Sequence, residues 1–273
     1  MCAFLLAAKV THKADKNKNI YSYNINCALR KIETHMDNIE YQEKYVLFID
    51  ILGFSEMVME STKDPKTFSN LHTTLLHIKK FAKVILGTEI TNSGKIEISI
   101  FSDCIAISTI DTTKGLGMIL AMASMIYCDL FHHGVMARGG LSKGKIYHSE
   151  GVIFGEGLVN AYTIESKTAI YPRVVVDDKV LTDLERDENP SDFRGSMRFE
   201  DFDGLQCLNV FNPNAIKMDP RISEWVSNGS YMNKGREAVR KSLTSANLSI
   251  RSKALWMKKY YNLHAANIGL EEI

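Results

Sequence analysis

The sequence has few cysteines and almost no net charge, and each of these facts narrows the class of protein. The 273 residues include five cysteines, widely spaced and without a C-x-x-C pair, so we expect reduced thiols and a cytoplasmic location. The net charge is only +1 at pH 7, with a pI near 7.6. Because nucleic-acid binding usually needs a broad basic surface, we expect no nucleic-acid partner and only local recognition of phosphate.

A long apolar run is also missing. No stretch approaches about eighteen consecutive apolar residues, the length of a membrane-spanning helix, so no membrane partner is expected. Residues 1–8 are apolar, but no basic residue precedes them and Lys9, His12 and Lys13 follow at once, which matches a signal peptide poorly. Hydrophobic residues make up 45% of the chain, enough for a substantial core in one large or two small domains.

Residues 46–55, VLFIDILGFS, form the stretch around which the rest of the chain is organised. The apolar run predicts a buried strand that ends in one carboxylate, Asp50, and turns sharply at Gly53. Phe48 and Asp50 share a face of this strand, because side chains alternate along it. A buried charge there is costly unless it is paired or holds a cation. Asp50 therefore indicates an ion pair or a metal site.

A second acid follows about fifty residues later. Residues 96–108 alternate apolar and polar side chains and predict two short strands, joined by a turn at Ser102 and Asp103. Two acids at the ends of adjacent buried strands predict a metal site; the alternative is that both acids only cap turns. Cys104, beside Asp103, is either a metal ligand or a small buried hydrophobic residue, which is the commoner role of free cysteine.

The rest of the pattern indicates an α+β fold. Apolar residues at intervals of three and four predict helices at 65–86, 113–132 and 156–167, and strands are predicted at 135–148, 152–154 and 173–177. Together with the segments above, this is the β-α-β-β-α-β order of ferredoxin-like folds. We expect an N-terminal extension at 1–43, the main domain at 44–215 and a helical C-terminal extension at 216–273.

Four stretches resemble the class III nucleotidyl cyclases. Residues 50–54, DILGF, match that family's D-I-x-G-F, and Asp103 stands where its next hairpin carries a second metal-binding aspartate. Residues 138–144, RGGLSKG, resemble its R-x-G-I-x-x-G strand, and residues 154–166 resemble the start of its G-x-x-V-N-x-A-x-R-x-E-S helix. The resemblance covers roughly residues 44–178 and implies a class III cyclase catalytic domain.

Some stretches of the sequence are most similar to one branch of the family, the pyrimidine cyclases of bacterial Pycsar anti-phage signalling. These stretches are FIDILGFS at 48–55, Ala161-Tyr162 with Glu165, Tyr171-Pro172-Arg173, and Trp256 with Tyr260-Tyr261-Asn262. The branch implies conversion of UTP or CTP to the 3′,5′-cyclic nucleotide and pyrophosphate. It also implies a head-to-tail homodimer with sites between the two copies.

The resemblance assigns roles to residues of the first strand and hairpin. Asp50 and Asp103 would bridge two Mn²⁺ or Mg²⁺ ions, and the Ile51 carbonyl would add an oxygen ligand. Residues 52–55, which include Leu52, Gly53 and Phe54, would cradle the phosphates through backbone N–H groups. Phe48 is either a nucleotide contact or an ordinary core phenylalanine.

The chain departs from the family at the helix that follows residue 155. In an ungapped alignment the family's transition-state asparagine and arginine fall on Val159 and Thr163, and Asn160 restores the asparagine only after a shift of one residue. Either another cation stabilises the α-phosphate or the chain is a catalytically impaired nucleotide-binding or interaction module. The candidate cations are Arg138, Lys143, Lys145 and Arg173, of which Arg173 could instead pair with Glu165.

The positions that read the base depart as well. Purine cyclases resemble one another in a lysine and an aspartate that here align with Ser99 and Val152. A smaller, neutral pocket fits a pyrimidine better and makes an ordinary adenylate cyclase the least favoured reading. The residues themselves do not separate UTP from CTP, and only the branch resemblance favours UTP.

Overall fold

The structure is a computed structural model that describes residues 40–86, 96–186, 195–212, 232–265 and 270–273. Contacts divide the chain into residues 1–40 and 41–273, and all that follows concerns the second unit. The predicted N-terminal extension thus lies almost wholly outside the described residues. So does the part of the predicted C-terminal extension before residue 232.

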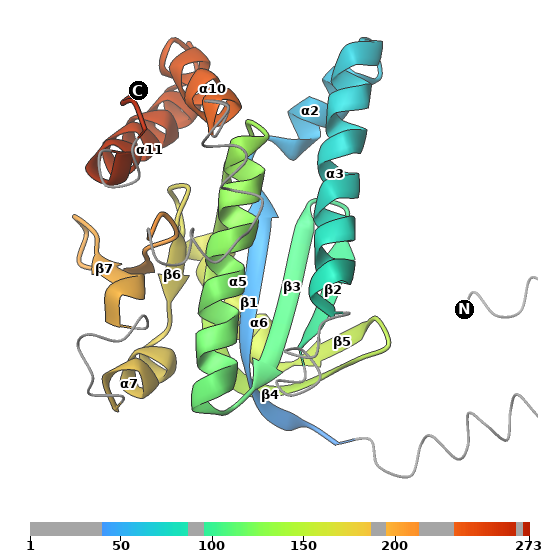
Figure 1. Ribbon diagram of the computed structural model, residues 1–273, viewed down its shortest axis with the longest axis vertical. Coiled ribbons are helices and arrows are strands. Elements are labelled where there is room, and N and C mark those ends of the chain that lie inside the picture. Colours follow the sequence, from blue (N-terminus) through green and yellow to red (C-terminus); the bar gives the residue numbers. More distant parts are fainter. Residues whose placement is uncertain (1–39, 87–95, 187–194, 213–231, 266–269) are drawn as a thin grey trace, which may run out of the picture. The chain divides into compact units, whose positions relative to one another are not determined.

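One sheet of eight strands forms the centre of the described chain (Figure 1). The strand order is β2-β3-β1-β4-β6-β8-β7, and β5 pairs with β4. β1 is antiparallel to both β3 and β4, and its apolar run suits this central position. The strands are β1 (Gln42–Ile51), β2 (Glu97–Phe101), β3 (Cys104–Ile110), β4 (Ala137–Ser149), β5 (Val152–Gly155), β6 (Val174–Val176), β7 (Arg198–Glu200) and β8 (Gln206–Leu208).

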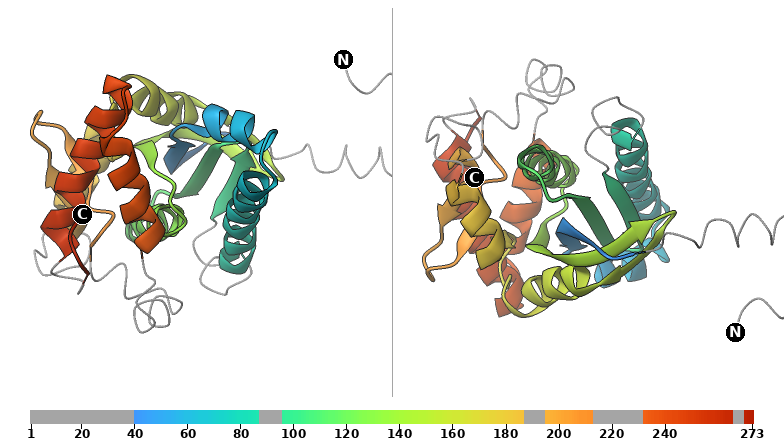
Figure 2. Two further views of the ribbon diagram at one scale, coloured as in Figure 1. Left: turned by 90° about the horizontal axis from the view of Figure 1, so that it is seen from above. Right: turned by 90° about the horizontal axis from the view of Figure 1, so that it is seen from below.

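Helices lie on both faces of this sheet, with α5 on one face and α6 on the other (Figure 2). Two further helices at the C-terminus, α10 and α11, pack against each other and join the main core through Val239, Met257 and Tyr261. The helices are α2 (Phe54–Ser61), α3 (Pro65–Leu86), α5 (Thr113–His132), α6 (Glu156–Lys167), α7 (Asp178–Arg186), α10 (Asn233–Leu243), α11 (Leu248–Ala265) and the short 3₁₀ helix η2 (Gly195–Met197).

α5 is the most apolar of these helices. Among the described helices it is long and apolar enough to cross a membrane by length and composition, yet 78% of that window is buried inside the protein. Leu116, Ile119 and Phe131 all lie in the main core. A helix that is apolar on most sides and enclosed by its own protein is typical of a core helix.

The two faces of β1 have different contents. Leu47 and Ile49 point toward α5 and join the main core. Val46 points the other way and packs with Ala161 beneath α6. Asp50 shares the parity of Val46, so the carboxylate lies on the α6 face.

The backbone of α6 lies in direct contact with the backbone of β4. A Cβ at Gly140 would collide with the Ala161 carbonyl oxygen and come within 2.8 Å of Ile164 Cβ. Farther along β4, a Cβ at Gly144 would lie 3.1 Å from the backbone nitrogen of Gly157. Side chains are excluded at these points, so the glycines fix the height of α6 above the sheet.

The predicted α+β class and the β-α-β-β-α-β order are confirmed. The helices at 113–132 and 156–167 have the predicted bounds. α3 begins where predicted, because the Asp64 carboxylate accepts the N–H groups of Lys66 and Thr67 and caps the helix. α7 and η2 were not predicted, and the strand expected at 135–148 runs instead from Ala137 to Ser149.

Candidate active site

Asp50 and Asp103 meet at one end of the central strands, as the sequence predicted. Asp50 is the second-last residue of β1 and Asp103 occupies the turn between β2 and β3. The backbone N–H of Ile51 donates to the Asp103 carbonyl oxygen at 3.2 Å, which fastens the two acid-bearing segments together. The carboxylates of Asp50 and Asp103 and the thiol of Cys104 each place one ligand atom within 4.8 Å of the others.

Cys104 stands opposite Asp50 in the β1–β3 register. Its Sγ lies 3.8 Å from Asp50 Oδ1 and 3.7 Å from Asp103 Oδ1, at hydrogen-bonding distance for sulfur. Burial, together with the two nearby carboxylates, raises the pKa of this thiol to about 12. Without a cation the side chain is therefore a neutral thiol that donates weakly to the acids.

Arg138 and Glu165 lie beside Asp50 and Asp103, and we call these four residues the Asp50 corner. Arg138 faces Asp50 across the β1–β4 pair, and its Nε lies 3.5 Å from Asp50 Oδ2 and 2.7 Å from Glu165 Oε1. The contact with Glu165 is an ion pair that does not meet hydrogen-bond geometry. Glu165 projects from α6 and is 2% exposed, and this burial raises its pKa to about 7.

Glu165 was not predicted as a site residue, although a signal for it exists in the sequence. Gly157, Ala161 and Glu165 follow one another at intervals of four, and the structure buries all three on the sheet side of α6. A carboxylate that continues an otherwise small and apolar helical stripe points at the sheet. Its partner there is Arg138.

The corner carries more negative than positive charge. Three carboxylates, those of Asp50, Asp103 and Glu165, lie near one guanidinium, that of Arg138. Burial raises the pKa of Asp50 and the Asp103 charge adds to the rise, while Arg138 opposes it. A divalent cation would relieve this excess, and Mg²⁺ and Mn²⁺ prefer oxygen ligands. The donor set therefore fits the predicted ions.

The phosphate cradle predicted at residues 52–55 is only partly available. Gly53 has a φ of 75°, which favours glycine, and it forms the N-cap of α2 next to the acids. The backbone N–H of Leu52, however, donates to the Met136 carbonyl oxygen at 2.9 Å. Leu52 is thus excluded as a phosphate donor, and Phe54 packs against the main core at the first position of α2.

Phe48 lies on the same face as Asp50, as expected. It is half-buried, packs under α6 and meets the ring of Tyr162 edge to face, with centroids 5.6 Å apart. Tyr162 itself is 54% exposed. The pair forms an aromatic wall beside the acids that remains open to solvent on one side.

Two of the predicted cations lie elsewhere. Lys143 faces Tyr45 across the β1–β4 pair, five residues from Arg138, and its Nζ lies 2.7 Å from both Asp111 and Asp183. Arg173 does not pair with Glu165. The structure corrects that alternative, because the guanidinium donates to Asp201 and Asp203, and it is 1% exposed.

The predicted base-reading residues lie on different elements. Ser99, on β2, is buried, and its hydroxyl lies 2.9 Å from Nε2 of His148 on β4. Val152 is 53% exposed and starts β5, just after the turn at Glu150 and Gly151, whose φ values are 53° and 80°. Positive φ at both residues is typical of a tight type I′ hairpin turn. His148 was not predicted, and it links the hairpin to Ser99.

Asn160, predicted as catalytic, is not brought to the acids of its own chain. It precedes Ile164 by one helical turn, and Ile164 packs with Val175 and Cys207 on the β6 side of α6. Tyr162, which contacts Phe48, lies on the other flank of the helix. Lys145 is exposed on β4, seven residues from Arg138.

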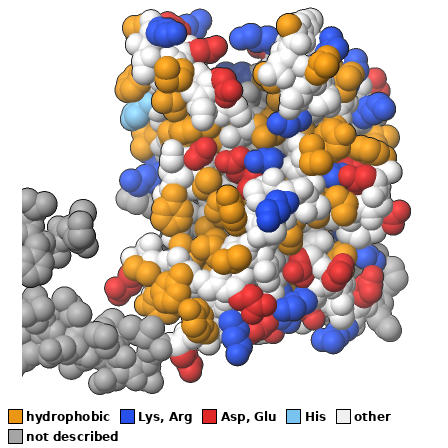
Figure 3. Space-filling view, turned by 180° about the vertical axis from the view of Figure 1, so that it is seen from behind, with side chains coloured by type: hydrophobic (Ala, Val, Ile, Leu, Met, Phe, Trp, Pro, Cys, Tyr) orange, Lys and Arg blue, Asp and Glu red, His pale blue; other side chains and the backbone are white. Residues whose placement is uncertain are grey.

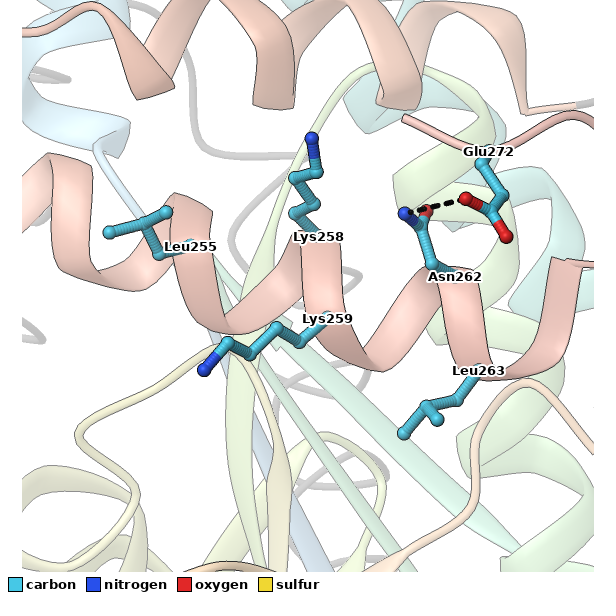
Figure 4. Close-up of a pocket in the computed structure, with 6 residues that line it drawn as sticks. All are labelled: Leu255, Lys258, Lys259, Asn262, Leu263 and Glu272. Carbon is cyan, nitrogen blue, oxygen red and sulfur yellow. Dashed lines mark hydrogen bonds between the residues drawn. The ribbon is translucent and has the colours of Figure 1, made fainter.

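A hollow elsewhere on the surface does not belong to this site. Its volume is about 570 Å³, and it is lined by Leu255, Lys258, Lys259, Asn262, Leu263 and Glu272. Figure 4 shows that these side chains spread from α11 and the C-terminus, with Lys258 and Lys259 pointing apart. The residues do not converge on one point, so the hollow is an open surface beside a helix.

Comparison with known proteins gives partial similarities. No protein-family model and no curated protein match the sequence. Two structures of a bacterial light-regulated adenylyl cyclase are 18% identical to this chain, with TM-scores of 0.38 and 0.34 and coverage of 61% and 63% of this chain. A class III adenylyl cyclase-like ATP-binding protein from Pseudomonas aeruginosa is 13% identical, with a TM-score of 0.35 over 52% of this chain. The chain matches 57%, 59% and 34% of those three chains, less than two thirds of each.

Proposed function

We propose that the protein is a nucleotide cyclase that converts a nucleoside triphosphate to its 3′,5′-cyclic monophosphate and pyrophosphate. The observation that carries the proposal is the corner of β1, β2 and β3, where Asp50 and Asp103 are fastened beside the start of α2. The D-I-x-G-F resemblance assigns Asp50 to a metal-dependent active site, and the resemblance of the following hairpin assigns Asp103 to the same site. The sequence and the geometry therefore point to the same residues.

The reaction is an in-line displacement at phosphorus. The ribose 3′-oxygen attacks the α-phosphorus, the bond to the β-phosphate oxygen breaks, and pyrophosphate leaves while the hydroxyl proton passes to solvent. Divalent ions held by Asp50, Asp103 and the Ile51 carbonyl would favour the alkoxide and balance the charge on the leaving group. The Gly53 turn and the first N–H groups of α2 would bind phosphate oxygens.

Arg138 is the cation best placed to stabilise the α-phosphate. It lies beside Asp50, whereas Lys143 and Arg173 are held in ion pairs away from the acids. Glu165 keeps the guanidinium at the sheet surface in the absence of nucleotide. A phosphate could then bind the N–H groups on one side of the Arg138 guanidinium, since guanidinium groups bind phosphate through paired N–H donors.

The substrate is proposed to be a pyrimidine nucleotide, UTP before CTP. Ser99 and Val152 replace the charged pair that purine cyclases of the resembled family carry. The resemblance of residues 48–55 and 171–173 to pyrimidine cyclases extends the proposal to a second messenger of anti-phage signalling.

A homodimer is proposed to complete the site. Asn160 lies on the far flank of α6 from Phe48, so a second copy is needed if an asparagine is to reach the reacting phosphate. Apolar side chains are exposed on this side of the sheet, among them Phe101, Val159 and Tyr162. Figure 3 shows hydrophobic side chains gathered across this face, with acidic and basic groups between them.

A second reading is a nucleotide-binding module without catalysis. One observation favours it: the chain has Val159 and Thr163 where the resembled family has its transition-state asparagine and arginine, and both side chains lie on the outer part of α6. The charge excess at Asp50 favours the enzyme instead, because a site without metal chemistry gains nothing from three clustered carboxylates.

The test is incubation of the purified protein with Mn²⁺ and each of the four nucleoside triphosphates, with products identified by mass spectrometry. We expect cyclic UMP, with less cyclic CMP. Asp50→Asn serves as the control for contaminating activity. Nucleotide binding without any cyclic product would establish the second reading, and a cyclic purine product would overturn the pyrimidine assignment.

A further inference from the structure

Two histidines from different helices lie against each other on the face of the sheet that α5 covers. His77 belongs to α3, and His133 is the C-cap residue of α5. The centroids of their imidazole rings are 4.9 Å apart, and the ring planes make an angle of 56°. Figure 2 shows α3 and α5 side by side on this face, with α6 and therefore the Asp50 corner on the other.

One ring nitrogen of His133 has a fixed role. Its Nδ1 lies 2.8 Å from the backbone carbonyl oxygen of Asp129, one turn earlier in α5. A carbonyl oxygen can only accept, so Nδ1 donates and carries the proton of the neutral ring, which places the lone pair on Nε2. Metal-binding histidines commonly have this arrangement, because a hydrogen bond at one nitrogen orients the ring and leaves the other nitrogen for the ion.

The neighbouring histidine has the opposite tautomer. His132 also contacts His133, with ring centroids 5.2 Å apart. Its Nδ1, however, accepts the backbone N–H of Met232 at 3.0 Å, so Nε2 carries the proton of the neutral ring. Neither nitrogen of a neutral His132 offers a lone pair to an ion while this hydrogen bond is present. The pair with the chemistry of a metal site is therefore His77 and His133, not the adjacent residues His132 and His133.

The separation of the two rings agrees with two imidazoles bound to one ion. A Zn²⁺–N bond is about 2.0–2.1 Å long and the ring centroid lies about 1.1 Å beyond the nitrogen, which places each centroid about 3.2 Å from the ion. At bond angles between about 90° and 110°, the two centroids would lie about 4.5–5.2 Å apart. The observed 4.9 Å is within this range. His77 is exposed and His133 is half-buried, so water can supply the remaining ligands.

α3 is attached to the rest of the protein more loosely than α5. Among the described side chains of α3 only Thr74 is buried, whereas most residues of α5 are buried. An ion held by one histidine from each helix would tie the outer helix to the core helix. Its binding would stabilise the folded state, because the unfolded chain does not bring the two histidines together.

We infer that His77 and His133 form a binding site for one divalent transition-metal ion of the zinc, copper and nickel class. Imidazole nitrogen suits these ions, whereas Mg²⁺ and Mn²⁺ prefer the oxygen ligands of the Asp50 corner. Each histidine binds the ion through one ring nitrogen, water completes the coordination, and the ion joins α3 to the end of α5. The site is separate from the Asp50 corner and does not depend on the proposed cyclase activity.

The first test is calorimetric titration of the purified full-length protein with Zn²⁺. His77→Ala and His133→Ala should each weaken Zn²⁺ binding at this site by about tenfold or more, since loss of even an outer partner of a metal-binding histidine costs about that much. The matched control is His72→Ala. His72 is another exposed histidine of α3, and its ring stacks on Phe68, so this variant should bind Zn²⁺ as the wild type does.

Two further measurements identify the ligands and the tie between the helices. Electron spin-echo spectra of the Cu²⁺–iminodiacetate complex bound to the protein should show two imidazole ligands in the wild type and one in His77→Ala. Zn²⁺ should raise the melting temperature of the wild type and of His72→Ala more than that of His77→Ala, because only the two-histidine site joins two helices. Melting without metal checks that each variant folds.

The outcomes separate a metal site from a simple ring contact. A single imidazole on Cu²⁺ in the wild type, or a Zn²⁺ affinity and melting shift that are the same in His77→Ala as in the wild type, would overturn the inference and leave an aromatic contact only. None of these measurements involves a nucleotide, so failure of the cyclase proposal would not change them.

Discussion

Two regions of this protein bring several acids to one arginine, and they differ in how well the charges of the acids are satisfied. Just before the start of β6, the Arg173 guanidinium donates to Asp201 and to both carboxylate oxygens of Asp203, at 2.9 and 2.6 Å, and Trp256 Nε1 donates to Asp201 at 2.7 Å. At the end of β1, Arg138 lies 3.5 Å from one oxygen of Asp50 and shares its charge with Glu165.

The pKa values of the acids move in opposite directions. Hydrogen bonds from Arg173 lower the pKa of Asp203 and outweigh its burial. At Asp50 burial outweighs Arg138, and the pKa rises. The acids of the Arg173 cluster are therefore satisfied without any added ion, and the cluster ties the β7–β8 hairpin to α11. At the Asp50 corner the single guanidinium of Arg138 does not balance the carboxylates. This difference in charge balance separates a structural cluster from a candidate active site.

The largest expected effect is on catalysis. Asp50→Asn and Asp103→Asn should each lower Mn²⁺-dependent turnover by about three orders of magnitude or more, because each would remove a ligand of the proposed ions, which would stabilise the transition state by several kcal/mol. Their melting temperatures should stay level or rise, since each loses a carboxylate from a crowded corner. A variant that turns over at nearly the wild-type rate in saturating Mn²⁺ would end the two-acid assignment.

The second prediction concerns stability at the other cluster. Arg173→Leu removes the donors of Asp201 and Asp203 and should lower the free energy of unfolding by about 1–3 kcal/mol, measured by urea titration. Arg173→Lys keeps the charge and is the matched control, with a smaller loss because lysine lacks the paired donors. If Arg173→Leu instead melts like the wild type, the Arg173 cluster does not stabilise the fold.

The third prediction uses the pH dependence of stability to distinguish the Asp50 corner from the Arg173 cluster. The pKa of Glu165 is raised from the usual carboxyl range to about 7, so the folded state binds this proton more tightly than the unfolded chain. Its contribution to stability is present at low pH and is lost as the pH rises through 7, by about 3 kcal/mol at 1.36 kcal/mol per pKa unit. Urea titrations in EDTA at pH 5 and pH 8 should show this loss in the wild type.

Glu165→Gln is the control for that prediction. The neutral amide cannot titrate, so the loss between pH 5 and pH 8 should shrink, while other titrating groups contribute equally to both proteins. The same loss in both proteins would show that Glu165 is ionised throughout the range. Asp203, whose pKa is lowered, contributes in the opposite direction and only at acidic pH.

The smallest effect is expected at Cys104. Mg²⁺ and Mn²⁺ favour oxygen over sulfur, so Cys104→Ser and Cys104→Ala should change turnover by no more than about threefold. The measurement is kcat/KM across a Mn²⁺ titration. A large rise in the Mn²⁺ requirement of Cys104→Ala, rescued in Cys104→Ser, would make residue 104 a metal ligand after all.

Much of the fold follows from the sequence because local signals agree with it. The run at residues 46–51 predicts the central strand, Asp64 marks the start of α3, and the apolar stripe at 113–132 gives α5 its bounds. The meeting of Asp50 and Asp103 was predictable as well, since both follow buried strands. These features depend on spacing within short stretches.

The parts of the site that were missed depend on pairing between distant residues. Glu165 meets Arg138 only because α6 crosses β4, and His148 meets Ser99 only because the β4–β5 hairpin brings it across two strands. The Arg173 partners lie about thirty residues away in a short hairpin. Periodicity shows that a residue faces the sheet but does not show which residue it meets there.

The glycine contacts between α6 and β4 also determine where the site can move. Backbone lies directly on backbone at Gly140, so α6 cannot slide or tilt without a collision, and the Glu165 side of the corner is rigid. The opposite side is α2, an eight-residue helix with no buried residue that begins at the Gly53 turn. Segments with few buried contacts open at the lowest free energy. Of the two sides of the Asp50 corner, α2 is therefore the one that can move at the lower cost in free energy, and a nucleotide that bound there would displace α2 rather than α6.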